Sequence, residues 1–122
     1  MNQIPSAPAK IELSQVTHLY LSTTRAFMAV QDINLRVEEG EFICMVGPSG
    51  CGKTTLLSLM AGLELPTAGK VSIDGTPVRG TSRQVGYMLQ QDYLFNWRSI
   101  EDNVFLGLDI QGIRSRETEQ YA

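Results

Sequence analysis

The chain has 122 residues, 43% of them hydrophobic, and its 10 Lys and Arg against 13 Asp and Glu residues give a net charge of −3. This composition is that of about one small globular domain. The absence of a basic run argues against a nucleic-acid partner. No apolar stretch approaches the ~20 residues that a membrane span needs, and the N-terminus lacks the layout of a secretory signal. We therefore expect a cytoplasmic protein, with Cys44 and Cys51 reduced.

The first part of the chain predicts a tail and two strands. Residues 1–9 carry two prolines among small polar residues and are expected to form a flexible tail. In residues 10–20 apolar and polar positions alternate with Val16 out of step, which predicts a strand with a bulge. Residues 29–37 alternate cleanly and predict a second strand with one buried face. The lone histidine, His18, is given no role.

Residues 42–62 predict a buried strand, a glycine-rich loop and a helix in succession. Residues 42–46 are apolar without alternation, as in a strand of a parallel sheet that is covered on both faces. The loop that follows fits the pattern G-x-x-x-x-G-K-[ST], with Gly47, Gly52, Lys53 and Thr54 at the fixed positions. Apolar residues at helical spacing come next, and a glycine at position 62 ends the helix.

This loop has the residue types that phosphate binding requires. Its glycines permit backbone conformations that a Cβ would forbid, so the N–H groups of residues 50–53 can converge on an anion. The helix that starts near Lys53 adds its unpaired N–H groups and the positive end of its dipole. Lys53 can reach the β- and γ-phosphates, and the Thr54 hydroxyl can bind Mg²⁺. A glycine-rich turn with a solvated lysine is the alternative, but it does not explain the strand before the loop and the helix after it.

The rest of the chain predicts two short strands and two helices. Residues 70–74 form the first strand, closed by a turn at Asp74-Gly75, and residues 84–89 form the second, which leads into Gln90. A helix begins after Ser99, which is its expected N-cap residue, and Asp102 three residues later completes the cap. Gly112 ends this helix. Another helix begins at Ser115.

From residue 11 to the end, these segments resemble in order the first half of an ATP-binding cassette (ABC) transporter ATPase domain. Tyr20 stands where that family keeps an aromatic residue that stacks on adenine. Residues 47–55 resemble its Walker A loop, residues 66–75 its β-hairpin, and Gln90 its Q-loop glutamine. Gln91 is adjacent, and the register favours Gln90.

The resemblance implies an α/β fold of the P-loop NTPase class and ABC ATPase type. This fold has an antiparallel β subdomain, the start of a parallel-sheet core and, from about residue 99, the start of a helical subdomain. The cofactors implied are ATP and Mg²⁺. Nucleotide binding is expected from Tyr20, Gly47, Pro48, Ser49, Gly50, Cys51, Gly52, Lys53, Thr54 and Thr55. Thr54 and Gln90 would hold Mg²⁺, and Lys53 and Gln90 would act in catalysis.

Residues 92–97, 102–104 and 107–112 are similar to the nitrate, sulfonate and taurine importers, although those usually have proline where Asn96 stands. The partners implied are transmembrane permease subunits, a second ATPase subunit and, indirectly, a periplasmic or extracellular solute-binding protein. The implied location is the inner face of the cell membrane. Trp97 is expected either to pack internally or to meet the permease.

The family's signature loop, Walker B strand, catalytic glutamate and switch histidine have no counterpart in these residues. The resemblance therefore covers the N-terminal half of the family's domain. We expect nucleotide binding without appreciable hydrolysis, and poor solubility, because the strand at residues 42–46 needs parallel neighbours. Three alternatives remain: another P-loop enzyme such as a small kinase or GTPase, a module that binds ATP as a structural ligand, and an ABC protein that works without a permease.

Overall fold

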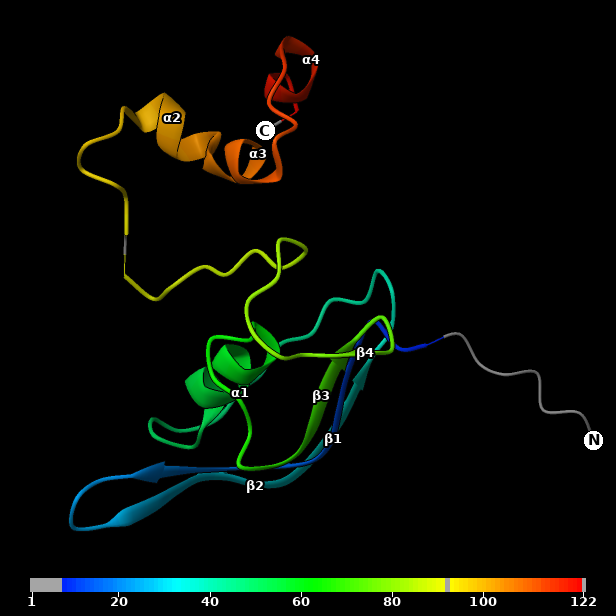
Figure 1. Cartoon of the computed structure of the whole chain (residues 1–122), viewed down its shortest axis with the longest axis vertical. Helices are drawn as coiled ribbons and strands as arrows, with labels where there is room; N and C mark the ends of the chain where they lie inside the picture. The colour runs from blue at the N-terminus through cyan, green and yellow to red at the C-terminus, as the bar shows by residue number, and fades with distance from the viewer. Residues whose placement is uncertain (1–7, 92, 122) are drawn as a thin grey trace, which may run out of the picture. The chain divides into compact units, whose positions relative to one another are not determined.

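The computed structural model describes residues 8–91 and 93–121, which divide into two compact units, Met1–Thr81 and Ser82–Ala122 (Figure 1). The tail expected at residues 1–9 lies mostly outside the described residues, and Ala9 at its end is buried. Among the described residues, no helix has both the length and the hydropathy that a bilayer crossing requires.

The first unit is built on a four-stranded antiparallel sheet with the strand order β2-β1-β3-β4. Its strands are β1 (Ile11–Leu21), β2 (Ala26–Val37), β3 (Ala68–Ile73) and β4 (Thr76–Pro77). The strands predicted at residues 10–20, 29–37 and 70–74 are confirmed, with ends that differ by a few residues. The turn at Asp74-Gly75 joins β3 to β4, and both of its residues have positive φ angles, 49° and 74°.

The bulge predicted in the first strand is confirmed. The pairing of β1 with β2 shifts register between Leu13 and Val16, where Gln15 has a φ of 51°. The N–H of Gln15 donates a 2.8 Å hydrogen bond to Oδ1 of Asn34, so the displaced backbone group keeps a partner. The bulge turns both Leu13 and Val16 into the core, where Val16 is fully buried.

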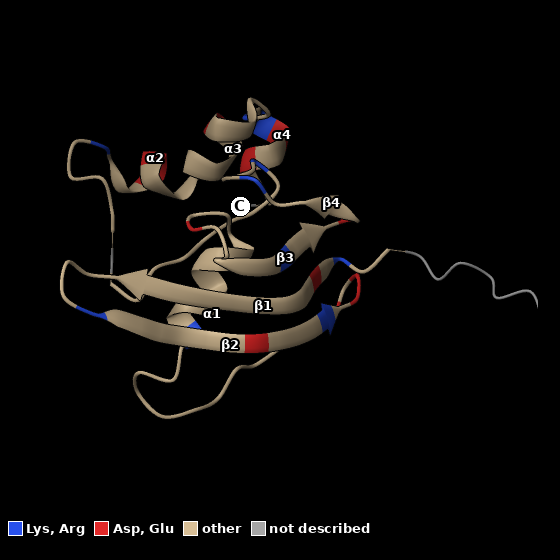
Figure 2. Cartoon of the chain, turned by 60° about the horizontal axis from the view of Figure 1, so that its bottom comes forward, with Lys and Arg blue, Asp and Glu red and all other residues tan. Residues whose placement is uncertain are grey.

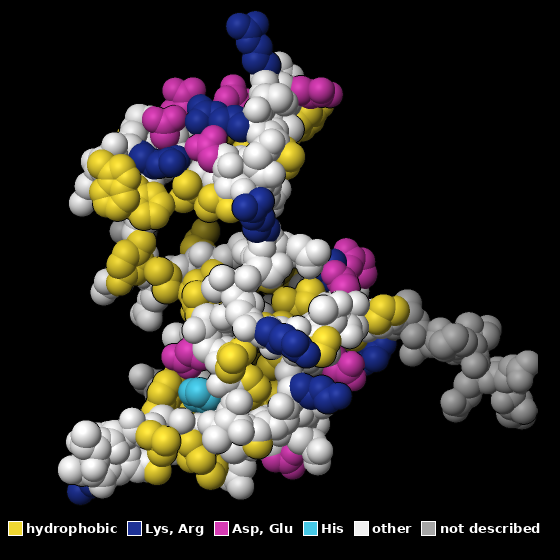
Figure 3. Space-filling view, viewed as in Figure 1, with side chains coloured by type: hydrophobic (Ala, Val, Ile, Leu, Met, Phe, Trp, Pro, Cys, Tyr) yellow, Lys and Arg dark blue, Asp and Glu magenta, His cyan; other side chains and the backbone are white. Residues whose placement is uncertain are grey.

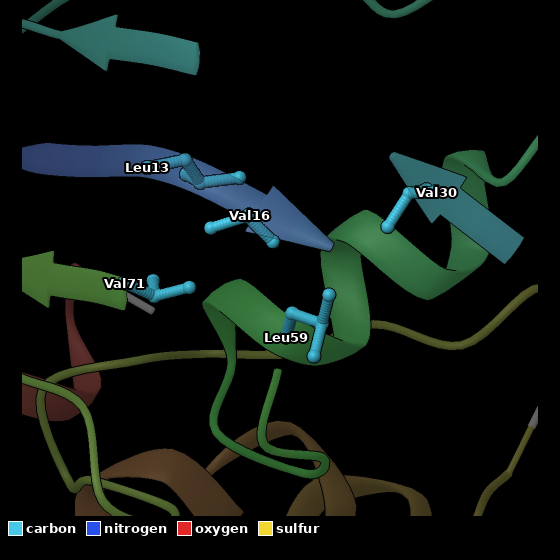
Figure 4. Close-up of a cluster of buried hydrophobic side chains, with 5 residues drawn as sticks. All are labelled: Leu13, Val16, Val30, Leu59 and Val71. Carbon is cyan, nitrogen blue, oxygen red and sulfur yellow. The ribbon is translucent and has the colours of Figure 1, made fainter. Parts of the chain in front are cut away.

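Helix α1 (Lys53–Met60) supplies the other side of the core. The buried cluster is Leu13, Val16, Val30, Leu59 and Val71, and these side chains converge between the strands and the helix (Figure 4). Leu56 and Met60 pack against this cluster, whereas Leu57 is 43% exposed on the opposite side. The helix predicted after the glycine-rich loop is therefore confirmed, and Gly62, with a φ of 72°, follows its end as expected.

Two of the predicted strands are wrong. Residues 42–46 and 84–89 are not strands, and Phe42, Val46 and Met88 are more than 90% exposed. An apolar run becomes a strand only through hydrogen bonds to a neighbour, and these segments pair with no strand in the described part of the chain. Cys44, which lies in the first of these segments, is likewise exposed, and its thiol is free.

The second unit contains the helices α2 (Ile100–Val104), α3 (Leu106–Gln111) and α4 (Arg116–Glu119). The predicted cap is confirmed, because Oγ of Ser99 accepts a 3.1 Å hydrogen bond from the N–H of Asp102. Gly112, with a φ of 71°, ends α3, and Ser115 starts α4 with a capping box. The single helix expected over these residues is divided at Phe105, which separates α2 from α3.

Ion pairs connect the helices of this unit, where acidic and basic residues lie close together (Figure 2). Arg114 contacts Asp102 at 3.2 Å and Glu119 at 2.8 Å, and Arg98 contacts Asp109 at 3.1 Å. The hydrogen bond from Ser99 and the Arg114 guanidinium hold the pKa of the Asp102 carboxyl below its ordinary value. These partly exposed pairs link short helices that have no buried residues, and each contributes little to stability.

Replacing Leu59 tests the core of the first unit. Leu59→Ala removes a fully buried side chain between α1 and the sheet, and we expect it to lower the free energy of unfolding by about 2–5 kcal/mol. Leu57→Ala makes the same chemical change on the exposed side of α1 and should cost about 1 kcal/mol or less. Urea denaturation followed by circular dichroism measures both. Equal losses for the two variants would contradict the packing described.

Candidate functional site

The glycine-rich loop reaches helix α1 through a tight turn that is pressed against strand β2. The N–H of Cys51 donates to the carbonyl of Pro48 at 3.4 Å, and Gly52 then adopts a φ of 92°. A Cβ on Gly52 would lie 2.6 Å from both the Ala29 carbonyl oxygen and Cγ1 of Val30. Only glycine fits this position, which explains why the pattern requires it.

The opposite end of the loop is closed by side chains. A Cβ on Gly47 would come within 2.8 Å of Sγ of Cys51, so this glycine allows the two ends of the loop to approach each other. Gly50 also has a positive φ, 78°, but a Cβ there would meet open space. The loop is therefore narrow at its base and open at its tip, a shape that can admit an anion to the backbone.

The N-terminus of α1 has no cap from a side chain. Gly52 stands at the N-cap position, and the first turn carries no acidic residue. The first helical hydrogen bond runs from the N–H of Leu56 to the carbonyl of Gly52 at 2.9 Å, so the N–H groups of residues 53–55 have no acceptor within the helix. These donors and the positive end of the dipole fit a phosphate group.

The ammonium of Lys53 lies inside the loop. Its Nζ donates to the carbonyls of Gly47 at 2.7 Å and Pro48 at 2.8 Å, and lies 3.4 Å from Sγ of Cys51. These contacts engage all three of its donors. The positive charge is thus already held at the centre of the loop, and a phosphate oxygen that binds it would replace at least one of these contacts.

The two threonines that follow Lys53 differ in their surroundings. Thr54 is exposed, whereas Thr55 is buried, with its Oγ1 3.3 Å from Oη of Tyr20. A hydroxyl beside the loop suits Mg²⁺, which binds few protein groups and completes its shell with phosphate oxygens and water. The described residues include no cluster of three His, Cys, Asp or Glu that could hold a metal by themselves. Thr54 is thus the threonine whose hydroxyl is accessible to such an ion.

Tyr20 connects the sheet to this helix. The residue is 39% exposed, and its ring stands edge-on to the His18 ring, with centroids 4.7 Å apart. Its hydroxyl donates a 2.7 Å hydrogen bond to Oε2 of Glu64 and contacts Thr55. The Thr55 contact lowers the pKa of Tyr20, the Glu64 contact and burial raise it, and the net shift is upward. The phenol therefore stays protonated at neutral pH.

Gln90 belongs to the second unit, where it is exposed at a bend. The neighbouring Gln91 accepts a 3.4 Å hydrogen bond from Oη of Tyr93 through its Oε1. Gln91 is thus engaged within its own loop, which favours Gln90 as the glutamine that could act on a ligand. The role of Gln90 toward Mg²⁺ stays a prediction.

A largely apolar groove of about 510 Å³ also lies in the second unit. In the space-filling view, hydrophobic side chains are exposed over this unit (Figure 3). Trp97 is 79% exposed and its ring lies 4.8 Å from that of Phe95, so it packs on one side and is open on the other. The residues lining the groove are Tyr87, Met88, Leu89, Gln91, Tyr93, Leu94, Phe95, Asn103 and Leu106.

Sequence reasoning missed three residues that organise these sites. Asn103 connects α2 to the preceding loop, because its Oδ1 accepts from the Phe95 N–H at 2.8 Å and its Nδ2 donates to the Ser99 carbonyl at 2.8 Å. Glu64 and His18 surround the Tyr20 hydroxyl and ring. No local pattern could reveal Glu64, because its contacts with Tyr20 and His18 join segments that lie more than 40 residues apart in the sequence. His18 meets the Tyr20 ring from two positions away on the same strand, a spacing that the alternation along β1 contains.

The family model for the ABC transporter matches residues 30–122. The chain belongs to the ABC transporter family. It is 49% identical over 112 residues to an uncharacterized ABC transporter ATP-binding protein, YtlC of Bacillus subtilis, and covers 43% of that protein's length. It is 43% identical to the taurine import ATP-binding protein TauB of Burkholderia pseudomallei and 38% identical to the nitrate import ATP-binding protein NrtD of Synechocystis.

Solved structures give the same assignment of fold. The ATP-binding cassette MJ0796, in a dimeric post-hydrolysis state bound to ADP and Pi, matches with a TM-score of 0.77 at 30% identity. A second dimeric structure of this cassette matches with a TM-score of 0.78 at 31% identity. In both cases this chain is covered over 91% of its length and the cassette over 53%. The fold predicted from the sequence, that of ABC ATPase cassettes, is confirmed.

The chain spans about two fifths of the curated relatives it matches. The match to YtlC includes 92% of this chain, the match to TauB 86% and the match to NrtD 88%. The same matches include only 43%, 40% and 40% of the length of YtlC, TauB and NrtD. The match includes the glycine-rich loop and Gln90, because both lie within residues 30–122.

Substitution of Gly52 tests the close approach of the loop to β2. Gly52→Ala should destabilise the first unit by more than Gly40→Ala does, because both positions have positive φ but only at Gly52 would the new Cβ meet backbone. The strain shared by both is about 1–2 kcal/mol. Urea denaturation gives the difference between the variants. Equal destabilisation would show that the loop does not press against Ala29 and Val30.

Proposed function

We propose that this chain is the N-terminal part of an ATP-binding subunit that energises an ABC importer, for solutes of the nitrate, sulfonate and taurine kind. The observation that carries the proposal is the start of α1, which has no capping side chain, with the Lys53 ammonium beside it. The names of TauB and NrtD support the importer class and the kind of solute. They also favour it over the alternative of an ABC protein that works without a permease.

Each residue of the loop has a separate task in this proposal. The N–H groups at the start of α1 and the Lys53 ammonium bind the phosphates and balance their charge, which is the main requirement in phosphoryl transfer. The backbone of Pro48, Ser49 and Gly50 forms the tip of the loop. Thr54 offers its hydroxyl to Mg²⁺, while Thr55 contributes its N–H and turns its side chain toward Tyr20. When bound, ATP with Mg²⁺ supplies the γ-phosphoryl group whose transfer to water drives transport.

The Tyr20 ring is proposed to stack on the adenine. Stacking tolerates any base, because every base has a π-face. The contact from Oη of Tyr20 to Thr55 holds the ring next to the first turn of α1, which is where the phosphates are proposed to bind. Gln90 is proposed to approach Mg²⁺ and the attacking water. Apart from Gln90, these 122 residues match none of the groups with which the family positions the attacking water. We therefore expect these residues to bind ATP without appreciable ATP hydrolysis.

The partners proposed are transmembrane permease subunits, a second ATPase subunit and, through the permease, an external solute-binding protein. The apolar groove of the second unit and the exposed side of Trp97 are the surface that would meet the permease. The dimeric state of the MJ0796 cassette supports pairing with a second subunit. The location proposed is the cytoplasmic face of the cell membrane.

Lys53→Ala tests the phosphate site. We expect it to weaken ATP binding in the presence of Mg²⁺ by about 10- to 100-fold, because it removes charge-assisted hydrogen bonds to phosphate. Lys70→Ala removes the same charge from an exposed position on β3 and should leave the affinity unchanged. Equilibrium dialysis with labelled ATP measures both. Unchanged affinity in the Lys53 variant would refute the proposed function.

A further inference from the structure

Four polar side chains of the first unit lie together in one group, which we call the Glu64 cluster: His18, Tyr20, Thr55 and Glu64. Hydrogen bonds join Tyr20 to Thr55 and to Glu64, and the His18 ring contacts Tyr20 and Glu64. They come from strand β1, from helix α1 and from the segment that follows the helix. The residue expected to stack on the base, Tyr20, lies in the middle of the cluster. The phosphate loop is adjacent, because Thr55 is in the first turn of α1.

The chemistry of a carboxylate fixes the direction of these hydrogen bonds. The ionised Glu64 can only accept, so the 2.7 Å contact to its Oε2 is donated by the Tyr20 hydroxyl. The Tyr20 oxygen is then left as an acceptor, and the Thr55 hydroxyl at 3.3 Å is its donor. The hydrogen bond from Tyr20 to the ionised Glu64 carboxylate belongs to the stronger class of hydrogen bonds in proteins.

His18 contacts the same carboxylate oxygen. Its side chain is 11% exposed, and its Nε2 lies 3.4 Å from Oε2 of Glu64. The other ring nitrogen, Nδ1, is buried without a hydrogen-bond partner in the described residues. The ring of His18 also meets the Tyr20 ring edge-on, with planes at 85°.

We propose that Glu64 is a positioning residue for the nucleobase, which holds the Tyr20 ring in one orientation through its hydroxyl. This inference rests on the proposed function. Tyr20 is 39% exposed, so packing covers only part of this residue, and its two side-chain torsions need further contacts to hold them in one rotamer. The hydrogen bonds at its hydroxyl and the edge contact with His18 supply this constraint before the ligand arrives. The nucleotide then does not have to order the ring when it binds.

The test compares ATP with inorganic tripolyphosphate, which has the phosphates and lacks the base. Glu64→Ala should weaken ATP binding by about two- to tenfold, the cost of ordering one side chain, and leave tripolyphosphate binding unchanged. Glu64→Gln keeps an acceptor oxygen for the Tyr20 hydroxyl and should retain most of the ATP affinity. Glu39→Ala is the matched control, because it removes an exposed carboxylate that pairs with Lys10 near the opposite end of β1.

A double substitution separates positioning from general stability. Tyr20→Phe keeps the ring but removes the hydroxyl, so Glu64→Ala should have no further effect on ATP affinity in that background. Equal losses for ATP and tripolyphosphate, or a full effect of Glu64→Ala in the Tyr20→Phe background, would overturn the inference while leaving the phosphate site intact. Failure of the unsubstituted chain to bind either ligand would instead refute the proposed function, and the inference with it.

Discussion

The packing of helix α1 on the antiparallel sheet is the constraint on which the site depends. Leu59 is fully buried against Leu13, Val16, Val30 and Val71, so the helix cannot shift along the sheet without opening the core. The start of α1 is held in the same way, because Gly52 is pressed against the backbone of β2. The core therefore determines where the unpaired N–H groups of the helix lie. The bulge in β1 contributes to this, because it turns both Leu13 and Val16 into the core.

The N-terminus of α1 is held in place by packing and leaves backbone N–H donors without a partner in the helix. A helix N-terminus without a capping side chain is unfavourable unless an anion or water satisfies its donors. Here the first turn contains no carboxylate that could do so, and the nearest charge is the Lys53 ammonium. The same helix turns Thr55 toward Tyr20, so the end of α1 that we propose binds phosphate is connected by one hydrogen bond to the exposed aromatic residue. Local geometry thus joins the two parts of the proposed nucleotide site.

Local patterns predicted the parts of the structure that local physics decides. The bulge in β1, the glycine-ended helices, the cap at Ser99 and the helix start at Ser115 follow from nearest-neighbour chemistry, and all are confirmed. The strands expected at residues 42–46 and 84–89 are wrong, because strand formation depends on a distant partner that sequence patterns do not reveal. The residues of the glycine-rich loop could be named in advance because they are neighbours in the sequence. The contacts of Glu64 with Tyr20 and His18 could not, because they join distant segments.

The most direct test of this account is nuclear magnetic resonance of the ¹⁵N-labelled chain during titration with tripolyphosphate and Mg²⁺. The central claim is that the backbone at the start of α1 binds phosphate. It predicts that the amide signals of Gly50, Gly52, Lys53, Thr54 and Thr55 shift with saturation, while amides on β3 and in the helices of the second unit stay in place. Shifts confined to other residues, or no saturable shift at the start of α1, would contradict it.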